Sequence, residues 1–226
     1  MKEQRGHGLD DEQIRPCASG PRYDHGGSDN CRVARVDHVA RTMSYDKMLS
    51  WSLLCTTLLD LQKSPMVYVI DPDGIVRSQA LATPDGGLRV TLNRAKTHRT
   101  VDGTFLADSI TAAVQLIALA TDDIFATVDA LAEHGFDPLP MPANYYADLA
   151  ALFDLDPDLL AQLEAASILY DEDAQGAFFQ LYSRPFCEGF FIEIVERRRG
   201  YAGFGGPNAP CRFAAQKRVM PLQGMP

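Results

Sequence analysis

The stretch "VQLIALATDDIFATVDAL" (114–131) joins a strand pattern directly to a helix pattern. Aliphatic residues fill 114–121, which predicts a buried strand. The helix that follows begins at Asp122 or Asp123, both good capping residues, and Gly135 supplies its end. A strand that feeds an amphipathic helix is the first half of a larger unit, and the rest of the chain shows what that unit is.

A similar unit precedes this stretch. "RVARVDHVAR" (32–41) is rich in valine and predicts a strand. The helix expected after it has an apolar face made of Met48, Trp51, Cys55 and Leu58 or Leu59. Three strand-like runs follow at 66–71, 76–83 and 88–93, separated by the turn sequences "DPDG" (71–74) and "PDGG" (84–87).

The order of elements then repeats. After 114–131 the sequence predicts short helices within 138–167, strands at 167–173, 177–183 and 190–197, and a short helix within 209–220. Strand, helix and three strands therefore occur twice, and "VDHVA" (36–40) aligns with "VQLIA" (114–118). Such an internal repeat indicates an α+β fold of two βαβββ modules that form a partly closed barrel. His38 and Leu116 hold equivalent places, so both are expected to face the shared cavity.

These patterns also divide the chain. We predict a tail or linker at 1–31, a first module at 32–100, a second module at 112–200 and a C-terminal tail at 201–226. The first segment is polar and glycine-rich, with no periodicity, as linkers are.

Composition limits the function. The chain has 226 residues, 46% of them hydrophobic, and a net charge of −9. Nucleic acid is a poor partner for this charge, and the clusters Arg197–Arg199 and Lys217–Arg218 are expected to be solvated ends. No secretory signal and no apolar run of about 20 residues occurs, so a cytoplasmic protein without a membrane span is expected. The five cysteines are scattered and predict reduced thiols.

Several ordered motifs carry a resemblance to a known family. They are "VDHVA" (36–40), "RSQALATPDGGLRVTLN" (77–93), "ALATDDIFATVDAL" (118–131), "ILYDEDAQGAFFQLYS" (168–183), "FFIEIVERR" (190–198) and "GFGGPN" (203–208). With them, residues 33–217 resemble the C-terminal domain of 4-hydroxyphenylpyruvate dioxygenase, of the vicinal-oxygen-chelate superfamily. "MPANYYADLAALFDLDPDLL" (141–160) and "FAAQKR" (213–218) look more like the dioxygenase-like half of the bacterial two-domain 3-dehydroshikimate dehydratases. The dehydratase barrel of those enzymes has no counterpart in these 226 residues.

The resemblance implies a metal site. In the dioxygenase family two histidines and one glutamate hold Fe(II), leaving open positions for a 2-oxo acid and O₂. The first histidine matches His38 and the glutamate matches Glu193, whereas the second histidine falls on Leu116. Ser78, Asn93 and Gln180 match polar residues that orient the substrate. Fe(II) or another divalent cation (Mg²⁺, Mn²⁺ or Co²⁺), weakly held or absent, is the cofactor that this set implies.

Two departures bear on the chemistry. Leu116 has no lone pair to donate, and His7, His25 and His98 match no family ligand. Ala209 stands where the dioxygenase has an aromatic residue against its substrate ring, which argues against hydroxyphenylpyruvate.

Four hypotheses remain open. The chain is a dehydratase-family domain with a weakened metal site, an active Fe(II)-dependent dioxygenase, a small-ligand binding module, or a drifted or truncated gene product. A small molecule is the expected partner in the first three, and assembly of identical copies is compatible with exposed strand edges.

Overall fold

The computed structural model describes residues 33–95, 113–186 and 189–220. The linker predicted at 1–31 and the histidines His7, His25 and His98 lie outside these residues. The described elements follow the predicted order closely, and the differences lie at one helix face and at one short strand.

The first half of the chain forms one helix and five strands among the described residues. They are β1 (Val33–Thr42), α1 (Tyr45–Leu58), β2 (Gln62–Lys63), β3 (Val67–Asp71), β4 (Gly74–Ala82) and β5 (Arg89–Ala95). The "DPDG" turn closes the β3–β4 hairpin, where Asp71 pairs with Gly74 and its carboxylate accepts a hydrogen bond from the Asp73 amide. The two-residue strand β2 was not predicted, because a strand this short has no periodicity to detect.

The predicted apolar face of α1 was partly wrong. Met48, Ser52 and Cys55 are buried, whereas Leu58 and Leu59 are exposed. The buried positions recur every three to four residues and end one turn before the helix does, so its last residues extend beyond the core that it covers.

The second half repeats the pattern with two added helices and a C-terminal extension. Its elements are β6 (Ala113–Thr121), α3 (Ile124–Glu133), α4 (Ala143–Leu152), α5 (Pro157–Ala165), β7 (Leu169–Asp173), β8 (Gly176–Tyr182), β9 (Phe191–Arg199), η1 (Gly206–Asn208) and α6 (Ala209–Val219). Asp123 caps α3 as predicted, its side chain accepting a hydrogen bond from the Ala126 amide.

The strand pairing shows the internal repeat. In the first half β1 pairs in parallel with β5, and in the second half β6 pairs in parallel with β9. The two first strands, β1 and β6, pair antiparallel and join the halves into one mixed sheet in the order β2-β4-β5-β1-β6-β9-β8-β7, with β3 added on β4. The two modules therefore meet along the strands that carry His38 and Leu116.

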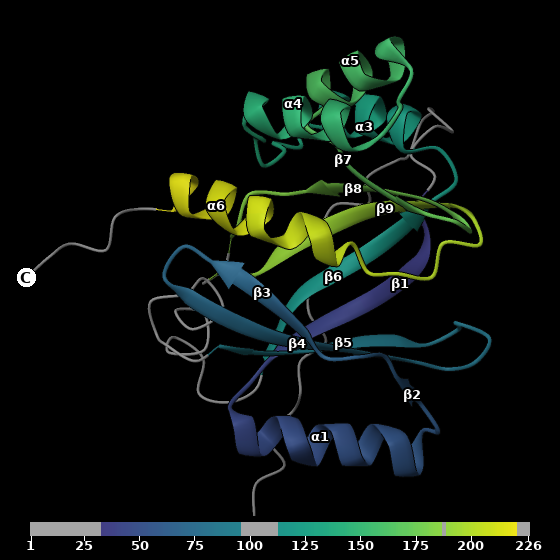
Figure 1. Ribbon diagram of the computed structural model, residues 1–226, viewed down its shortest axis with the longest axis vertical. Helices are drawn as coiled ribbons and strands as arrows, with labels where there is room; N and C mark the ends of the chain where they lie inside the picture. Colours follow the sequence, from purple (N-terminus) through teal and green to yellow (C-terminus); the bar gives the residue numbers. More distant parts are fainter. Residues whose placement is uncertain (1–32, 96–112, 187–188, 221–226) are drawn as a thin grey trace, which may run out of the picture.

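The sheet curls, and its helices lie in separate places (Figure 1). Helix α1 lies below β4 and β5, whereas α3, α4 and α5 lie above β7, β8 and β9. Helix α6 crosses beside β3, where Phe213 packs with Val69 and Val76. The concave side of the sheet is left for a cavity that α6 and the preceding loop help to enclose. No helix of the described residues is long and apolar enough to cross a membrane.

Candidate functional site

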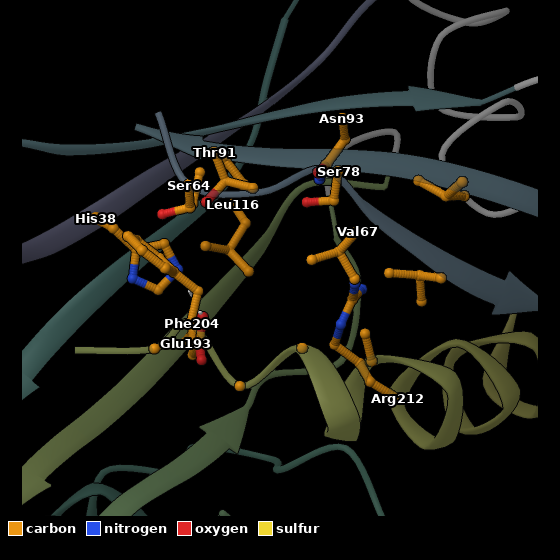
Figure 2. A pocket seen from close by; sticks show the side chains of 18 of the residues that line it. His38, Ser64, Val67, Ser78, Thr91, Asn93, Leu116, Glu193, Phe204 and Arg212 are labelled. Carbon is orange, nitrogen blue, oxygen red and sulfur yellow. Dashed lines mark ion pairs between the residues drawn. The ribbon is translucent and has the colours of Figure 1, made fainter. Parts of the chain in front are cut away.

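A cavity of about 340 Å³ lies inside the curled sheet and receives side chains from both modules. Its walls are largely apolar, and polar side chains gather toward two ends (Figure 2). His38 and Glu193 lie at one end, whereas Ser78, Asn93 and Arg212 lie at the other, with Leu116 between them. A concave, mostly apolar pocket with a few convergent polar groups has the form of a small-molecule site.

The strand register brings His38 and Glu193 together. His38 on β1 pairs with Ala118 on β6, and Ala118 pairs with Glu193 on β9, so the three residues form one row across the sheet. The central residue of the row carries only a methyl group, which lets the two longer side chains meet. His38 Nε2 lies 3.3 Å from Glu193 Oε2, and both residues are buried.

A bulge in β1 gives His38 a second acidic partner. The pairing of β1 with β6 shifts between Val36 and His38, which leaves Asp37 out of the ladder. Asp37 Oδ1 consequently lies 2.8 Å from His38 Nδ1, although neighbouring residues of a regular strand point to opposite faces. Burial lowers the pKa of His38, but the charges and hydrogen bonds of Glu193 and Asp37 outweigh it and raise this pKa to about 9.

Arg197 anchors Asp37 in turn. Its Nε and Nη2 each donate to one oxygen of the Asp37 carboxylate at 2.8 Å, a bidentate pair. Burial raises the pKa of Asp37, but hydrogen bonds from Arg197 and His38 outweigh it and hold this pKa well below its ordinary value. The prediction that Arg197–Arg199 form a solvated end was therefore wrong for Arg197. Its place four residues after Glu193, on the same face of β9, was the signal that could have revealed it.

Gln180 holds Glu193 from behind and does not line the cavity. Its Nε2 donates to Glu193 Oε1 at 2.8 Å, and its Oε1 accepts from Asn208 Nδ2 at 2.8 Å. The side chain is almost fully buried. Gln180 was predicted from the resemblance as a residue that orients substrate, and here its amide orients a carboxylate of the protein itself.

Ser78 and Asn93 line the far end of the cavity, as Figure 2 shows. They pair directly across β4 and β5, which places their side chains side by side. Thr91, two residues before Asn93 on the same face, also lines the cavity, and its buried hydroxyl has no hydrogen-bond partner among the described residues. The structure thus gathers three neutral polar groups on one wall.

Leu116 faces the cavity between these two ends. It lies two residues before Ala118 on β6, on the same face as the row of His38 and Glu193. Within residues 33–95, 113–186 and 189–220, no group of three or more His, Cys, Asp or Glu side chains is arranged to hold a metal ion. The described residues therefore do not fit the three-ligand iron centre that the resemblance implied, and the replacement of its third ligand by Leu116 stays a prediction.

The loop before η1 closes the cavity over His38. Phe204 meets the His38 ring edge-on, with 5.5 Å between the ring centroids. Gly205 follows with a left-handed backbone, φ of 61°, and a Cβ at this position would overlap the Gln180 amide. Glycine is required here twice, for its backbone conformation and for its lack of a side chain.

Replacing Gly205 by alanine is expected to lower the free energy of unfolding by about 2 kcal/mol or more, since the left-handed backbone and the overlap with Gln180 both cost energy. Gly206→Ala is the matched control, because a Cβ there would meet only Val67 Cγ1, at 4.0 Å. Urea denaturation of the two variants measures the difference. Equal stability of both would show that Gln180 does not pack against this loop.

Comparison with known proteins agrees with this fold. Residues 35–159, more than half of the chain, match the Glyoxalase/Bleomycin resistance protein/Dioxygenase superfamily. The chain belongs to this superfamily, whose vicinal-oxygen-chelate fold is the one that the repeated βαβββ unit predicted.

Comparison with individual relatives shows which members of the superfamily the chain resembles. It is 42% identical over 188 residues to a 3-dehydroshikimate dehydratase of Pseudomonas aeruginosa, covering 83% of this chain and 30% of the dehydratase. It is 28% identical over 195 residues to a 4-hydroxyphenylpyruvate dioxygenase of Legionella pneumophila, covering 85% of this chain and 56% of the dioxygenase. The chain thus spans under a third of the first relative and a little over half of the second.

Two solved structures superpose well on the chain. One is described as a xylose isomerase-like TIM barrel/4-hydroxyphenylpyruvate dioxygenase fusion protein, with a TM-score of 0.70 and 37% identity, covering 82% of this chain and 30% of that protein. The other is a mutant of 4-hydroxymandelate synthase from Streptomyces coelicolor, with a TM-score of 0.71 and 25% identity, covering 81% of this chain and 53% of that one. This chain is a dioxygenase-like domain related to part of the dehydratases.

Proposed function

We propose that this domain binds a small organic molecule in its cavity without oxygenating it. The observation that carries the proposal is Leu116, whose aliphatic side chain faces the cavity beside His38 and Glu193. A centre that binds both a 2-oxo acid and O₂ needs a firmly held iron, and an inner ligand is missing. The cavity itself is retained, with a volume at the lower end of the range for ligand pockets.

The network around His38 supports this proposal. Asp37 and Glu193 contact the two ring nitrogens of His38, while Arg197 and Gln180 hold those carboxylates from behind. Each of these side chains has a hydrogen-bond or ion-pair partner within the protein. The polar end of the cavity therefore forms a charged network that needs no ligand to satisfy it. The network joins β1 of the first module to β8 and β9 of the second.

A weakly held divalent ion is the second candidate for the same end of the cavity. His38 Nε2 and Glu193 Oε2 are 3.3 Å apart, close enough for both to contact one ion. With two protein ligands and water, Mg²⁺, Mn²⁺, Co²⁺ or Fe²⁺ would be bound weakly and would serve a structural or regulatory role. In a dehydratase-family protein such a domain would assist assembly, and its association into homo-oligomers stays a prediction.

Oxygen uptake separates these functions from that of an active dioxygenase. We expect protein supplied with Fe(II) under anaerobic conditions, then mixed with O₂ and a panel of 2-oxo acids, to consume no more oxygen than Fe(II) alone. In parallel, at least one small organic acid is expected to raise the melting temperature, because ligand at a hundred times its Kd stabilises the folded state by about 2.7 kcal/mol. Sustained oxygen uptake with formation of a product would contradict the proposal.

The Leu116→Phe variant serves as the control for the location of binding. Its larger ring fills part of the cavity beside His38, so the ligand-induced rise in melting temperature should shrink or disappear. An unchanged rise would place the ligand outside this cavity.

A further inference from the structure

Arg212 is a buried cation that the sequence patterns did not single out. It lies on α6, is 8% exposed and lines the cavity. Figure 2 shows its side chain rising from the helix into the end of the cavity where Ser78 and Asn93 lie. A guanidinium is rarely buried unless a counter-charge meets it, so the partners of this group decide its role.

The partners that the structure gives Arg212 are all neutral. Its Nη1 donates to Gln216 Oε1 at 2.8 Å, one turn along the same helix, and the guanidinium lies 4.2 Å from the centre of the Phe213 ring. Arg212 forms no ion pair with a carboxylate in the part of the chain that the structure describes. Arg197, by comparison, has Asp37 as a bidentate partner. One arginine near the cavity is neutralised and the other is not.

The charges inside the cavity do not balance without a ligand. His38 and Glu193 share one ion pair, and the pair has no net charge whichever of the two holds the proton. Arg212 is the remaining charged group among the described residues that line the cavity, which leaves one positive charge. Burying an unpaired charge is costly, and a bound anion would remove that cost.

The groups beside Arg212 suit an oxyanion. Ser78 and Asn93 lie at the same end of the cavity and form no side-chain hydrogen bond with the described residues. Each of these side chains can donate a hydrogen bond, and the fork of a guanidinium matches the two oxygens of a carboxylate. Leu116 lies between this end and His38 and gives the cavity an apolar side there, whereas Ser64 and Thr91 lie nearer His38.

We propose that the cavity takes a small organic acid with one carboxylate, held by Arg212 with Ser78 and Asn93, and that the apolar body of the acid lies against Leu116. This inference rests on the proposed function of the cavity as a ligand site and adds the chemical class of the ligand. It makes Arg212 the anchor that selects anions over neutral molecules of the same shape.

Titration calorimetry with matched ligands tests whether Arg212 anchors the carboxylate. The probes are small carboxylic acids, each measured beside its primary amide, beginning with 4-hydroxybenzoate and 4-hydroxybenzamide. The wild-type protein is expected to bind the acid at least about tenfold more tightly than the amide, the range expected for charge-assisted hydrogen bonds. In Arg212→Met this preference should vanish, while the melting temperature of the ligand-free protein stays level or rises, because the buried charge is gone.

Arg218→Met is the matched control, since Arg218 lies on the same helix but is exposed; it should keep the full preference for the acid. If the wild-type protein binds acid and amide equally, Arg212 does not anchor a carboxylate, although the cavity remains a ligand site. If neither member of any pair binds, the proposed function fails together with the anchor. The comparison of acid and amide affinities in the wild-type protein tests the proposal even if Arg212→Met does not fold.

Discussion

Replacing Leu116 by histidine is expected to raise the affinity of the domain for Fe(II) more than about 100-fold. Loss of an outer-shell partner alone typically costs 10–100-fold in metal affinity, so restoring an inner ligand should gain more. The physical basis is the row across β1, β6 and β9, which already brings His38 and Glu193 to 3.3 Å on the face from which residue 116 projects. Anaerobic titration with Fe(II) measures the dissociation constants of the parent and the variant.

Two further variants separate coordination from changes in packing. Leu116→Ile keeps an aliphatic side chain of the same volume and should leave the metal affinity of the parent unchanged. Glu193→Gln in the Leu116→His background removes one ligand and should lose most of the gain. If Leu116→His binds Fe(II) no better than Leu116→Ile, residue 116 does not reach the ion, and its aliphatic side chain is not what prevents an iron centre.

Replacing Asp37 by asparagine is expected to lower the free energy of unfolding by about 3–5 kcal/mol, the usual cost of breaking a buried ion pair by removing one partner. The variant leaves Arg197 without a counter-charge and takes from His38 one of its two acidic contacts. The change in shape is minimal, because asparagine and aspartate are nearly isosteric. Urea denaturation followed by circular dichroism measures the loss.

Asp137→Asn is the matched control for this prediction. Asp137 also pairs with an arginine, Arg184, but both side chains are well exposed, at 67% and 43%. Exposed pairs contribute about 0–1 kcal/mol, so this variant should be nearly as stable as the parent. Similar losses in the two variants would mean that burial of Asp37 adds nothing to the strength of its pairs.

The sequence predicted the elements and the meeting of the modules well because both depend on local patterns. The repeat of "VDHVA" in "VQLIA" placed His38 and Leu116 at equivalent positions, and the alternation of a strand then placed both in one cavity. The hairpin at Asp71–Gly74 followed from turn residues alone. These predictions needed no knowledge of contacts between distant parts of the chain.

The parts of the site that could not be predicted depend on tertiary packing. Asp37 turns toward His38 because of a bulge in β1, and the sequence carries no mark of that bulge. Arg212 lies on a helix whose polar composition gives no apolar stripe, so its buried face could not be inferred from periodicity. The resemblance predicted Gln180 as a residue that orients substrate, and only the geometry shows that its side chain contacts the Glu193 carboxylate and does not line the cavity.

The central claim is that the cavity binds its ligand without help from a metal. Calorimetric titration of the tightest-binding organic acid, into protein treated with a chelator and into protein supplied with Fe(II) under anaerobic conditions, tests this most directly. The account predicts equal dissociation constants in the two samples and a sharp loss of binding in Arg212→Met. Binding that disappears in chelator and returns with Fe(II) would contradict it, because the ligand would then be held by a metal at His38 and Glu193.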